Sequence, residues 1–299
     1  MNNTIQYTVD NDGIATLMLD LPGKSMNVLC DALIADLSEC IEKVVADDNV
    51  KGAIIASAKS AFVAGADLTE LVTAYDRGVT TLEGYEWSKG LSGVFRRMET
   101  CGKPFAVAIN GLALGGGLEL CLACHYRVMA DHPKAQLGLP EVSIGLLPGA
   151  GGTQRLPRLI GTEKALGVIL QGKKLRPQAA LELGVVHEIA PVDELLDRAR
   201  TWLLEMPNPV APWDVKGFRF PGGAGAMTPK NAQTFMVGTS LLAGMTHHNY
   251  PAPIGAMSAV YEGCITPMDQ GLDIESQYFG ELVSGVVARN MMRSLFVNK

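Results

Sequence analysis

The sequence predicts an α/β fold whose sheet is mostly parallel, followed by a helical C-terminal region. Four short apolar runs bounded by Gly, Pro or Asp are typical of strands, namely 14–20, 52–57, 104–109 and 126–130. Over 28–46, apolar residues recur every four positions and predict an amphipathic helix. Strands that alternate with helices favour parallel pairing, so we expect an α/β core.

The pattern changes near residue 190. Residues 192–206 predict an amphipathic helix, and 207–229 contains five prolines and four glycines, which no regular element accommodates. Beyond this loop, helical patterns cover 230–244, 254–265 and 269–295. We therefore expect two parts, a core over residues 1–189 and a helical region over residues 190–299.

Composition excludes several classes of protein. The chain has 299 residues, 47% hydrophobic and 19% charged, with a formal net charge of −6, so disorder is excluded as its main state. No basic run exceeds two residues, which argues against a nucleic-acid partner. Residues 1–10 lack a secretory pattern, and no apolar stretch approaches the ~18 residues of a membrane span. With six scattered cysteines, we expect a cytoplasmic chain with reduced thiols.

Three short motifs are false leads. The run Cys121-Leu-Ala-Cys124-His125 matches a haem-attachment pattern, but its surroundings predict packed thiols in a buried helix. Residues 167–174 resemble a phosphate-binding loop, yet Lys174 stands where Ser or Thr is needed. Residues 149–152 lack the third glycine of a dinucleotide fingerprint, and the five histidines have no ligand spacing. We expect no metal.

One constellation of residues points to chemistry. Residues 104–119 (PFAVAINGLALGGGLE) predict a buried strand, a turn, three glycines and then Glu119 in an apolar run. Glycines at a strand-to-helix junction allow close backbone approach and leave N–H groups free at a helix N-terminus, where they suit an oxyanion. A second carboxylate, Glu141, follows, and the bend at 61–68 offers a second donor. Taken alone, Glu119 equally fits a helix-N-terminal acid stabilised by the dipole.

Three segments together resemble the enoyl-CoA hydratase/isomerase (crotonase) superfamily: AFVAGADLTEL, INGLALGGGLEL and QLGLPEVSIGLLPGAGGTQRLPRLIG. The resemblance runs from about residue 12 to residue 190 and implies a crotonase-like spiral of ββα units. It places the two catalytic acids at Glu119 and Glu141 and the two oxyanion-hole amides at Ala66 and Gly116. Further substrate- or CoA-binding candidates are Lys24, Ala64, Gly65, Asp67, Leu68, Gly115, Pro140 and Gly149.

The resemblance implies an acyl-CoA thioester substrate and no cofactor besides the coenzyme A that the substrate carries. Because both acids are present, it favours hydration of 2-trans-enoyl-CoA to 3-hydroxyacyl-CoA in β-oxidation, with possible isomerisation of 3-enoyl thioesters. The alternatives are another crotonase-fold isomerase or hydrolase, or a non-catalytic acyl-CoA- or RNA-binding member. Residues 71–100 are expected to line the acyl pocket or to form an ordinary packed helix, with Tyr75, Tyr85, Trp87, Val94 and Phe95 as candidates.

Residues 269–299 resemble the linker of the multifunctional fatty-acid oxidation α subunit, in which an NAD-binding dehydrogenase region follows. No Gly-x-Gly-x-x-Gly unit is found in these 299 residues, so we expect no reduction of NAD⁺ by this chain. A thiolase or dehydrogenase partner is expected if the chain works in a β-oxidation complex. We also expect the C-terminal helices to fold back on their own chain, giving a monomer or small homo-oligomer.

Overall fold

The computed structural model describes residues 2–205, 209–224 and 228–297. Contacts divide the chain into two compact units. The first unit comprises Met1–Ala66, Gly93–Leu137 and Leu175–Ala211, and the second comprises Asp67–Ser92, Gly138–Lys174 and Pro212–Lys299. The predicted division of the chain at residue 189 stays a prediction. The two units are defined by their internal contacts, and each is built from three separate segments of the sequence, so they do not test a single boundary.

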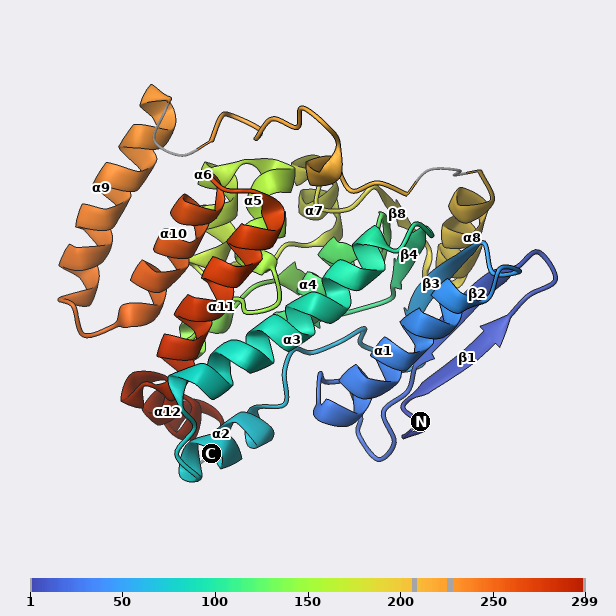
Figure 1. Ribbon diagram of the computed structural model, residues 1–299, viewed down its shortest axis with the longest axis horizontal. Coiled ribbons are helices and arrows are strands. Elements are labelled where there is room, and N and C mark those ends of the chain that lie inside the picture. The colour runs from blue at the N-terminus through green and yellow to red at the C-terminus, as the bar shows by residue number, and fades with distance from the viewer. Residues whose placement is uncertain (1, 206–208, 225–227, 298–299) are drawn as a thin grey trace. The chain divides into compact units, whose positions relative to one another are not determined.

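A six-stranded sheet forms the centre of the first unit (Figure 1). Its strands, in spatial order, are β1 (Ile5–Val9), β2 (Ile14–Leu19), β3 (Gly52–Ser57), β4 (Phe105–Ile109), β6 (Tyr126–Ala130) and β8 (Glu188–Ala190). Strand β1 pairs antiparallel with β2, and every other pair is parallel. The predicted parallel α/β core is therefore confirmed. The edge strand β1 was not predicted, because its side chains after Ile5 are polar or partly exposed.

Helices of the first unit cover this sheet. Helix α8 packs against β3, β4 and β6, and α1 contacts β1. The helices and short strands of this unit are α1 (Asp31–Ala46), the end of α3 (Thr81–Thr100), β5 (Ala113–Leu114), α4 (Gly116–Ala123), β7 (Leu137–Gly138), α7 (Pro177–Leu183), η2 (Val192–Glu194) and α8 (Leu195–Glu205). Strand β3 is buried along most of its length and β4 and β6 along all of theirs, which explains their unbroken apolar runs.

The second unit is helical. It contains α2 (Leu68–Asp76), the start of α3, η1 (Glu141–Ile144), α5 (Gly152–Ile160), α6 (Thr162–Ile169), η3 (Pro212–Asp214), α9 (Pro229–Thr246), α10 (Pro251–Gly263), α11 (Met268–Ser284), α12 (Val286–Met292) and a π-helical turn, Arg293–Val297. Within this unit α10 packs against α5, α6, α9 and α11 (Figure 1), and α12 packs against η1 and α2. The C-terminal helices thus fold back on their own chain, as expected.

Two sequence-based boundaries were wrong. The helix expected over 269–295 is broken at Gly285, whose backbone is extended and whose carbonyl accepts a hydrogen bond from the Tyr75 hydroxyl at 2.5 Å. The helix expected from residue 28 begins at Asp31, because Leu29 forms a β-bridge with Ala66 instead. The expected loop over 207–229 contains the short helix η3, and its residues 207, 208 and 225–227 lie outside the described residues.

The six cysteines are free thiols, and five of them are buried, which confirms that Cys121 and Cys124 are packing residues. Over the described ranges, no helix combines the length and apolar character needed to cross a bilayer. Within the same ranges, no group of three His, Cys, Asp or Glu side chains is placed to hold a metal ion.

Two histidines whose rings are partly desolvated predict acid-sensitive folding. Desolvation of its ring, which stacks on Tyr126, lowers the pKa of His187 to about 3, helped by nearby Arg127, and desolvation also lowers the pKa of His125. The unfolded chain then binds more protons than the folded chain below the ordinary histidine pKa of about 6.5, so stability is full above that pH and falls as the pH drops toward 3.

Urea unfolding at several pH values measures this loss. The variant His187→Gln is expected to show a shallower fall in unfolding free energy with pH than the unaltered chain. His132→Gln is the matched control, because the His132 ring accepts a hydrogen bond from the Lys134 N–H within its own exposed turn. Equal pH slopes for the unaltered chain and His187→Gln would contradict the assignment.

Candidate active site

Helix α4 carries the first predicted acid. Glu119 lies in its first turn and is only 2% exposed. The N–H groups of Leu118 and Glu119 both donate to the Gly115 carbonyl, at 2.8 and 3.0 Å. Since the first turn of a helix leaves its N–H groups without intrahelical acceptors, the amide of Gly116 is available to a ligand by the geometry of the helix itself.

Glycine is required at the start of α4 for two reasons. Gly115 has φ 53° and ψ −129°, a backbone conformation that side-chain-bearing residues rarely adopt. A Cβ atom on Gly117 would lie 2.3 Å from the Val63 carbonyl oxygen, so the two backbones meet without room for a side chain. The close backbone approach expected from the glycine run is therefore confirmed.

The bend that ends at Ala66 lies beside this helix start. Val63 forms a parallel bridge with Ala113, and the Leu114 N–H donates to the Val63 carbonyl at 3.0 Å. Ala66 itself is exposed. The Glu119 Oε2 atom lies 3.8 Å from the position that a Cβ on Gly116 would occupy. The first unit thus brings together the bend that ends at Ala66, the Gly116 amide and the Glu119 carboxylate.

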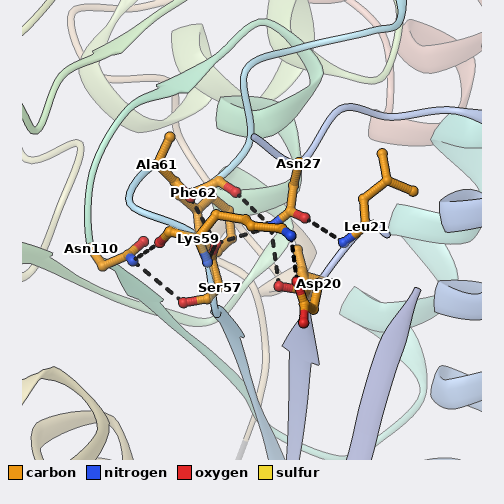
Figure 2. A network of polar contacts seen from close by, with 9 residues as sticks. Asp20, Leu21, Asn27, Ser57, Lys59, Ala61, Phe62 and Asn110 are labelled. Atoms are coloured by element: carbon orange, nitrogen blue, oxygen red, sulfur yellow. Dashed lines mark hydrogen bonds and ion pairs between the residues drawn. The ribbon is translucent and has the colours of Figure 1, made fainter. Parts of the chain in front are cut away.

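A polar network centred on Asn27 holds the bend (Figure 2). The Asn27 side chain, which is fully buried, accepts from the Leu21 N–H at 2.9 Å and donates to the Phe62 carbonyl at 3.2 Å. The Ser57 hydroxyl donates to the Ala61 carbonyl at 2.7 Å, and Lys59 pairs with Asp20 at 2.6 Å. Asn27 was not among the residues predicted to belong to the site. A lone polar residue in the run 26–30 (MNVLC) is the signal that was available.

The second predicted acid belongs to the second unit. Glu141 is the first residue of η1 and is half-buried, and its carbonyl accepts from the Leu146 N–H at 3.0 Å. The turn ends at Gly145, which has φ 84°. A Cβ on Gly145 would lie 2.6 Å from the Cα of Ala288, so α12 packs directly on the segment that carries Glu141.

Helix α11 holds the loop that follows Glu141. Glu275, which is fully buried, accepts from the Gly151 N–H at 2.5 Å, the Thr153 N–H at 2.8 Å and the Thr153 hydroxyl at 2.5 Å. The carboxylate therefore satisfies N–H groups at the start of α5, where the helix dipole also favours negative charge. Nearby, the Ser88 hydroxyl donates to the Gly149 carbonyl at 2.5 Å. Glu275 was not predicted from the sequence, because a glutamate in a helical pattern resembles a solvated residue.

Removing the Glu275 carboxylate is expected to destabilise the second unit strongly. Glu275→Ala leaves three buried donors without that acceptor, and we expect an unfolding free energy lower by about 3–5 kcal/mol, as for other broken buried charged networks. Chemical denaturation measures the loss. Glu281→Ala on the exposed side of the same helix is the control. A Glu275→Ala variant as stable as this control would show that the Glu275 hydrogen bonds contribute little to the stability of the fold.

The remaining site candidates fall at turns and helix starts. Lys24 lies in an exposed turn after β2. The Asp67 side chain accepts from the Thr69 N–H at 2.9 Å and so caps α2, and Pro140 immediately precedes η1. Gly149 is half-buried in the loop after η1. A role for any of these residues in binding CoA stays a prediction.

The expected acyl-pocket segment forms α2 and α3. Tyr75 and Phe95 are buried, whereas Tyr85 donates to the Asp273 carboxylate at 2.6 Å, and Arg77 lies over the Trp87 ring at 5.6 Å. These contacts explain the packing of both helices. The assignment of this segment to the acyl pocket stays a prediction.

Comparison with known families decides the class of protein. The family model described as enoyl-CoA hydratase/isomerase matches residues 10–212, about two thirds of the chain. The chain belongs to this family. The fold expected from the resemblance, a crotonase-type α/β core with C-terminal helices, is confirmed by the model and by its structural neighbours.

Curated relatives match almost the whole chain. It is 38% identical over 295 residues to the fatty acid oxidation complex subunit alpha of Shewanella amazonensis, covering 95% of this chain and 40% of that protein. The protein of the same name from Shewanella halifaxensis is 39% identical over 297 residues, covering 99% of this chain and 41% of that protein. The chain spans about two fifths of the length of these relatives.

Solved structures agree. A crystal structure of the enoyl-CoA hydratase of Geobacillus kaustophilus is similar with a TM-score of 0.62 and 27% identity, covering 93% of this chain and 86% of that one. The enoyl-CoA hydratase of Bacillus anthracis gives a TM-score of 0.61 and 28% identity, covering 88% and 91%. Together, the family and these structures support an enzyme of the enoyl-CoA hydratase/isomerase class.

Proposed function

We propose that this chain hydrates 2-trans-enoyl-CoA thioesters to 3-hydroxyacyl-CoA. The observation that carries the proposal is the start of α4, where the buried Glu119 carboxylate lies one turn from the Gly116 amide. A carboxyl group and a helix-N-terminal N–H beside each other suit a reaction that moves a proton while negative charge forms on a carbonyl oxygen.

In this mechanism the thioester oxygen accepts hydrogen bonds from the Ala66 and Gly116 amides. As the water oxygen bonds to C3, the C2–C3 π electrons move toward the thioester, and the two amides stabilise the resulting enolate. Such donors contribute about 3–4 kcal/mol each in acyl-transfer enzymes, where a preformed hole needs no reorganisation. No net oxidation occurs, so hydration requires no nicotinamide or flavin.

The two carboxyl groups complete the reaction. One of Glu119 and Glu141 takes a proton from the attacking water, and the other delivers a proton to C2. Glu119 belongs to the first compact unit and Glu141 to the second. The same acids acting on C2 and C4 of a 3-enoyl thioester would instead give isomerisation, the second activity in the description of the family.

A spectroscopic assay tests hydration. Crotonyl-CoA is expected to lose the ultraviolet absorbance of its conjugated thioester when the chain is added, and 3-hydroxybutyryl-CoA is the expected product. Adding NAD⁺ is expected to produce no NADH. No loss of absorbance at high protein concentration would refute hydration, and acyl-CoA binding without turnover would favour a non-catalytic member. In a β-oxidation complex, a dehydrogenase or thiolase partner would then consume the product.

A further inference from the structure

We infer that the three-residue segment 27–29 sets the relative position of the two proposed oxyanion amides, and that Asn27 is a positioning residue for this site. The inference rests on the proposed function, since it concerns the amides of Ala66 and Gly116. Asn27 does not touch the substrate in this account. It acts through the backbone of the bend that ends at Ala66.

The Asn27 side chain joins three pieces of the first unit. Its Nδ2 donates to the Leu19 carbonyl at 3.1 Å, to the Ser57 hydroxyl at 2.9 Å and to the Phe62 carbonyl at 3.2 Å. Its Oδ1 accepts from the Leu21 N–H. The end of β2, the end of β3 and the bend are therefore held by one buried amide (Figure 2). An apolar side chain in this place would leave buried backbone groups unsatisfied.

The backbone of segment 27–29 runs beside the bend like a short strand. The Ala64 N–H donates to the Asn27 carbonyl at 2.9 Å, and the Leu29 N–H donates to the Gly65 carbonyl at 2.8 Å. Leu29 and Ala66 form a parallel bridge. These bonds fix the Val63–Ala64 and Gly65–Ala66 peptide planes, and the second of these planes contains the Ala66 N–H.

The same segment also contacts the other proposed amide. The Leu29 Cδ1 atom lies 2.5 Å from the position that a Cβ on Gly116 would occupy, so the Leu29 side chain packs directly on the start of α4. One short segment thus links both amide-bearing backbones. A misplacement of about 1 Å costs on the order of 10²-fold in rate at such sites, which makes this link relevant to turnover.

Asn110 offers a matched control. Its side chain also donates to two backbone carbonyls, those of Ser57 and Lys59 between the end of β3 and the bend, at 3.4 and 2.7 Å. Both acceptors lie upstream of residues 62–66. Asn110→Ala therefore removes two side-chain hydrogen bonds close to the bend, against four for Asn27→Ala, and leaves the contacts of residues 62–66 in place.

The experiment compares Asn27→Ala, Asn110→Ala and the unaltered chain, each checked for folding by circular dichroism. Hydration of crotonyl-CoA gives kcat and KM. Binding of an aryl-conjugated enoyl-CoA gives a second readout, because its absorption moves to longer wavelength when the thioester oxygen accepts hydrogen bonds. We expect Asn27→Ala to lower kcat by about 10- to 100-fold, to change KM by less than about 3-fold and to reduce the spectral shift. Asn110→Ala should retain both readouts.

The outcomes separate the inference from the proposed function. If the unaltered chain hydrates crotonyl-CoA and Asn27→Ala keeps its kcat and spectral shift, the inference alone is wrong. If Asn110→Ala loses as much as Asn27→Ala, the effect is general to the fold and the inference is again wrong. If the unaltered chain shows neither turnover nor a spectral shift, the proposed function fails and the inference falls with it.

If Asn27→Ala does not fold, the variant Leu29→Ala tests the inference instead. This variant leaves the Asn27 hydrogen bonds in place and removes only the side chain over Gly116. A reduced spectral shift and a lower kcat at nearly unchanged KM are expected. Retention of both kcat and the spectral shift would overturn the claim that segment 27–29 sets the position of the two amides.

Discussion

Replacing Glu119 with glutamine is expected to lower kcat for crotonyl-CoA hydration by at least ~10²-fold, the lower end for losing a general acid or base. Glutamine keeps the size of the side chain and its hydrogen-bonding capacity but neither takes nor delivers the required proton. The exchange also removes a potential charge from a side chain that is 2% exposed, so folding should be retained. Steady-state kinetics beside circular dichroism measure both properties.

Glu141→Gln is expected to behave in the same way, since hydration needs one acid and one base. CoA affinity should change little in either variant, because neither carboxyl group is assigned to the nucleotide. Glu99→Gln is the matched control. Glu99 is as buried as Glu119 and pairs with Arg96 at 3.3 Å, outside the proposed site. Near-normal hydration by Glu119→Gln or Glu141→Gln would show that the residue's catalytic assignment is wrong.

Gly116→Pro is expected to reduce turnover by about 10²- to 10³-fold, the effect of losing one oxyanion donor. Gly116 is the first residue of α4, a position at which proline fits a helix well, so the substitution removes the N–H while the helix can still form. The ring also meets the Leu29 side chain, and for this reason a control with a side chain and an intact N–H is needed.

Gly116→Ala provides that control. Its Cβ would lie 2.5 Å from Leu29 Cδ1, the far end of a flexible side chain that can move, and its N–H is kept. We expect Gly116→Ala to retain much more activity than Gly116→Pro. Equal kcat values for the two folded variants would show that the Gly116 amide takes no part in the mechanism.

Local patterns predicted much of the fold because most elements carry their own signal. The four buried strands are short apolar runs, and α1 has an apolar stripe with a four-residue period. The edge strand β1 carries a weak signal because only its first side chain is buried, and its pairing with β2 is a tertiary property. The break at Gly285 is equally non-local, because the Tyr75 hydroxyl binds its carbonyl from 210 residues away.

The same distinction between local and non-local signals holds for the candidate site. The glycine run before Glu119 predicted a close backbone approach, because three glycines between a strand and a helix have few other physical explanations. The roles of Asn27 and Glu275 were not predictable, because each depends on partners from distant segments. Asn27 bonds to Phe62 across 35 residues, and Glu275 bonds to Gly151 across 124 residues. A single buried polar residue shows its function only when its partners are known.

Product analysis in labelled water tests the central claim most directly. Crotonyl-CoA is incubated with the chain in water that carries heavy oxygen, and separately in deuterated water, and the product is examined by mass spectrometry. Hydration by the proposed mechanism predicts 3-hydroxybutyryl-CoA with one heavy oxygen at C3 and, in deuterated water, one carbon-bound deuterium at C2. Unchanged crotonyl-CoA, or free coenzyme A with heavy oxygen in a released carboxylic acid, would contradict the account.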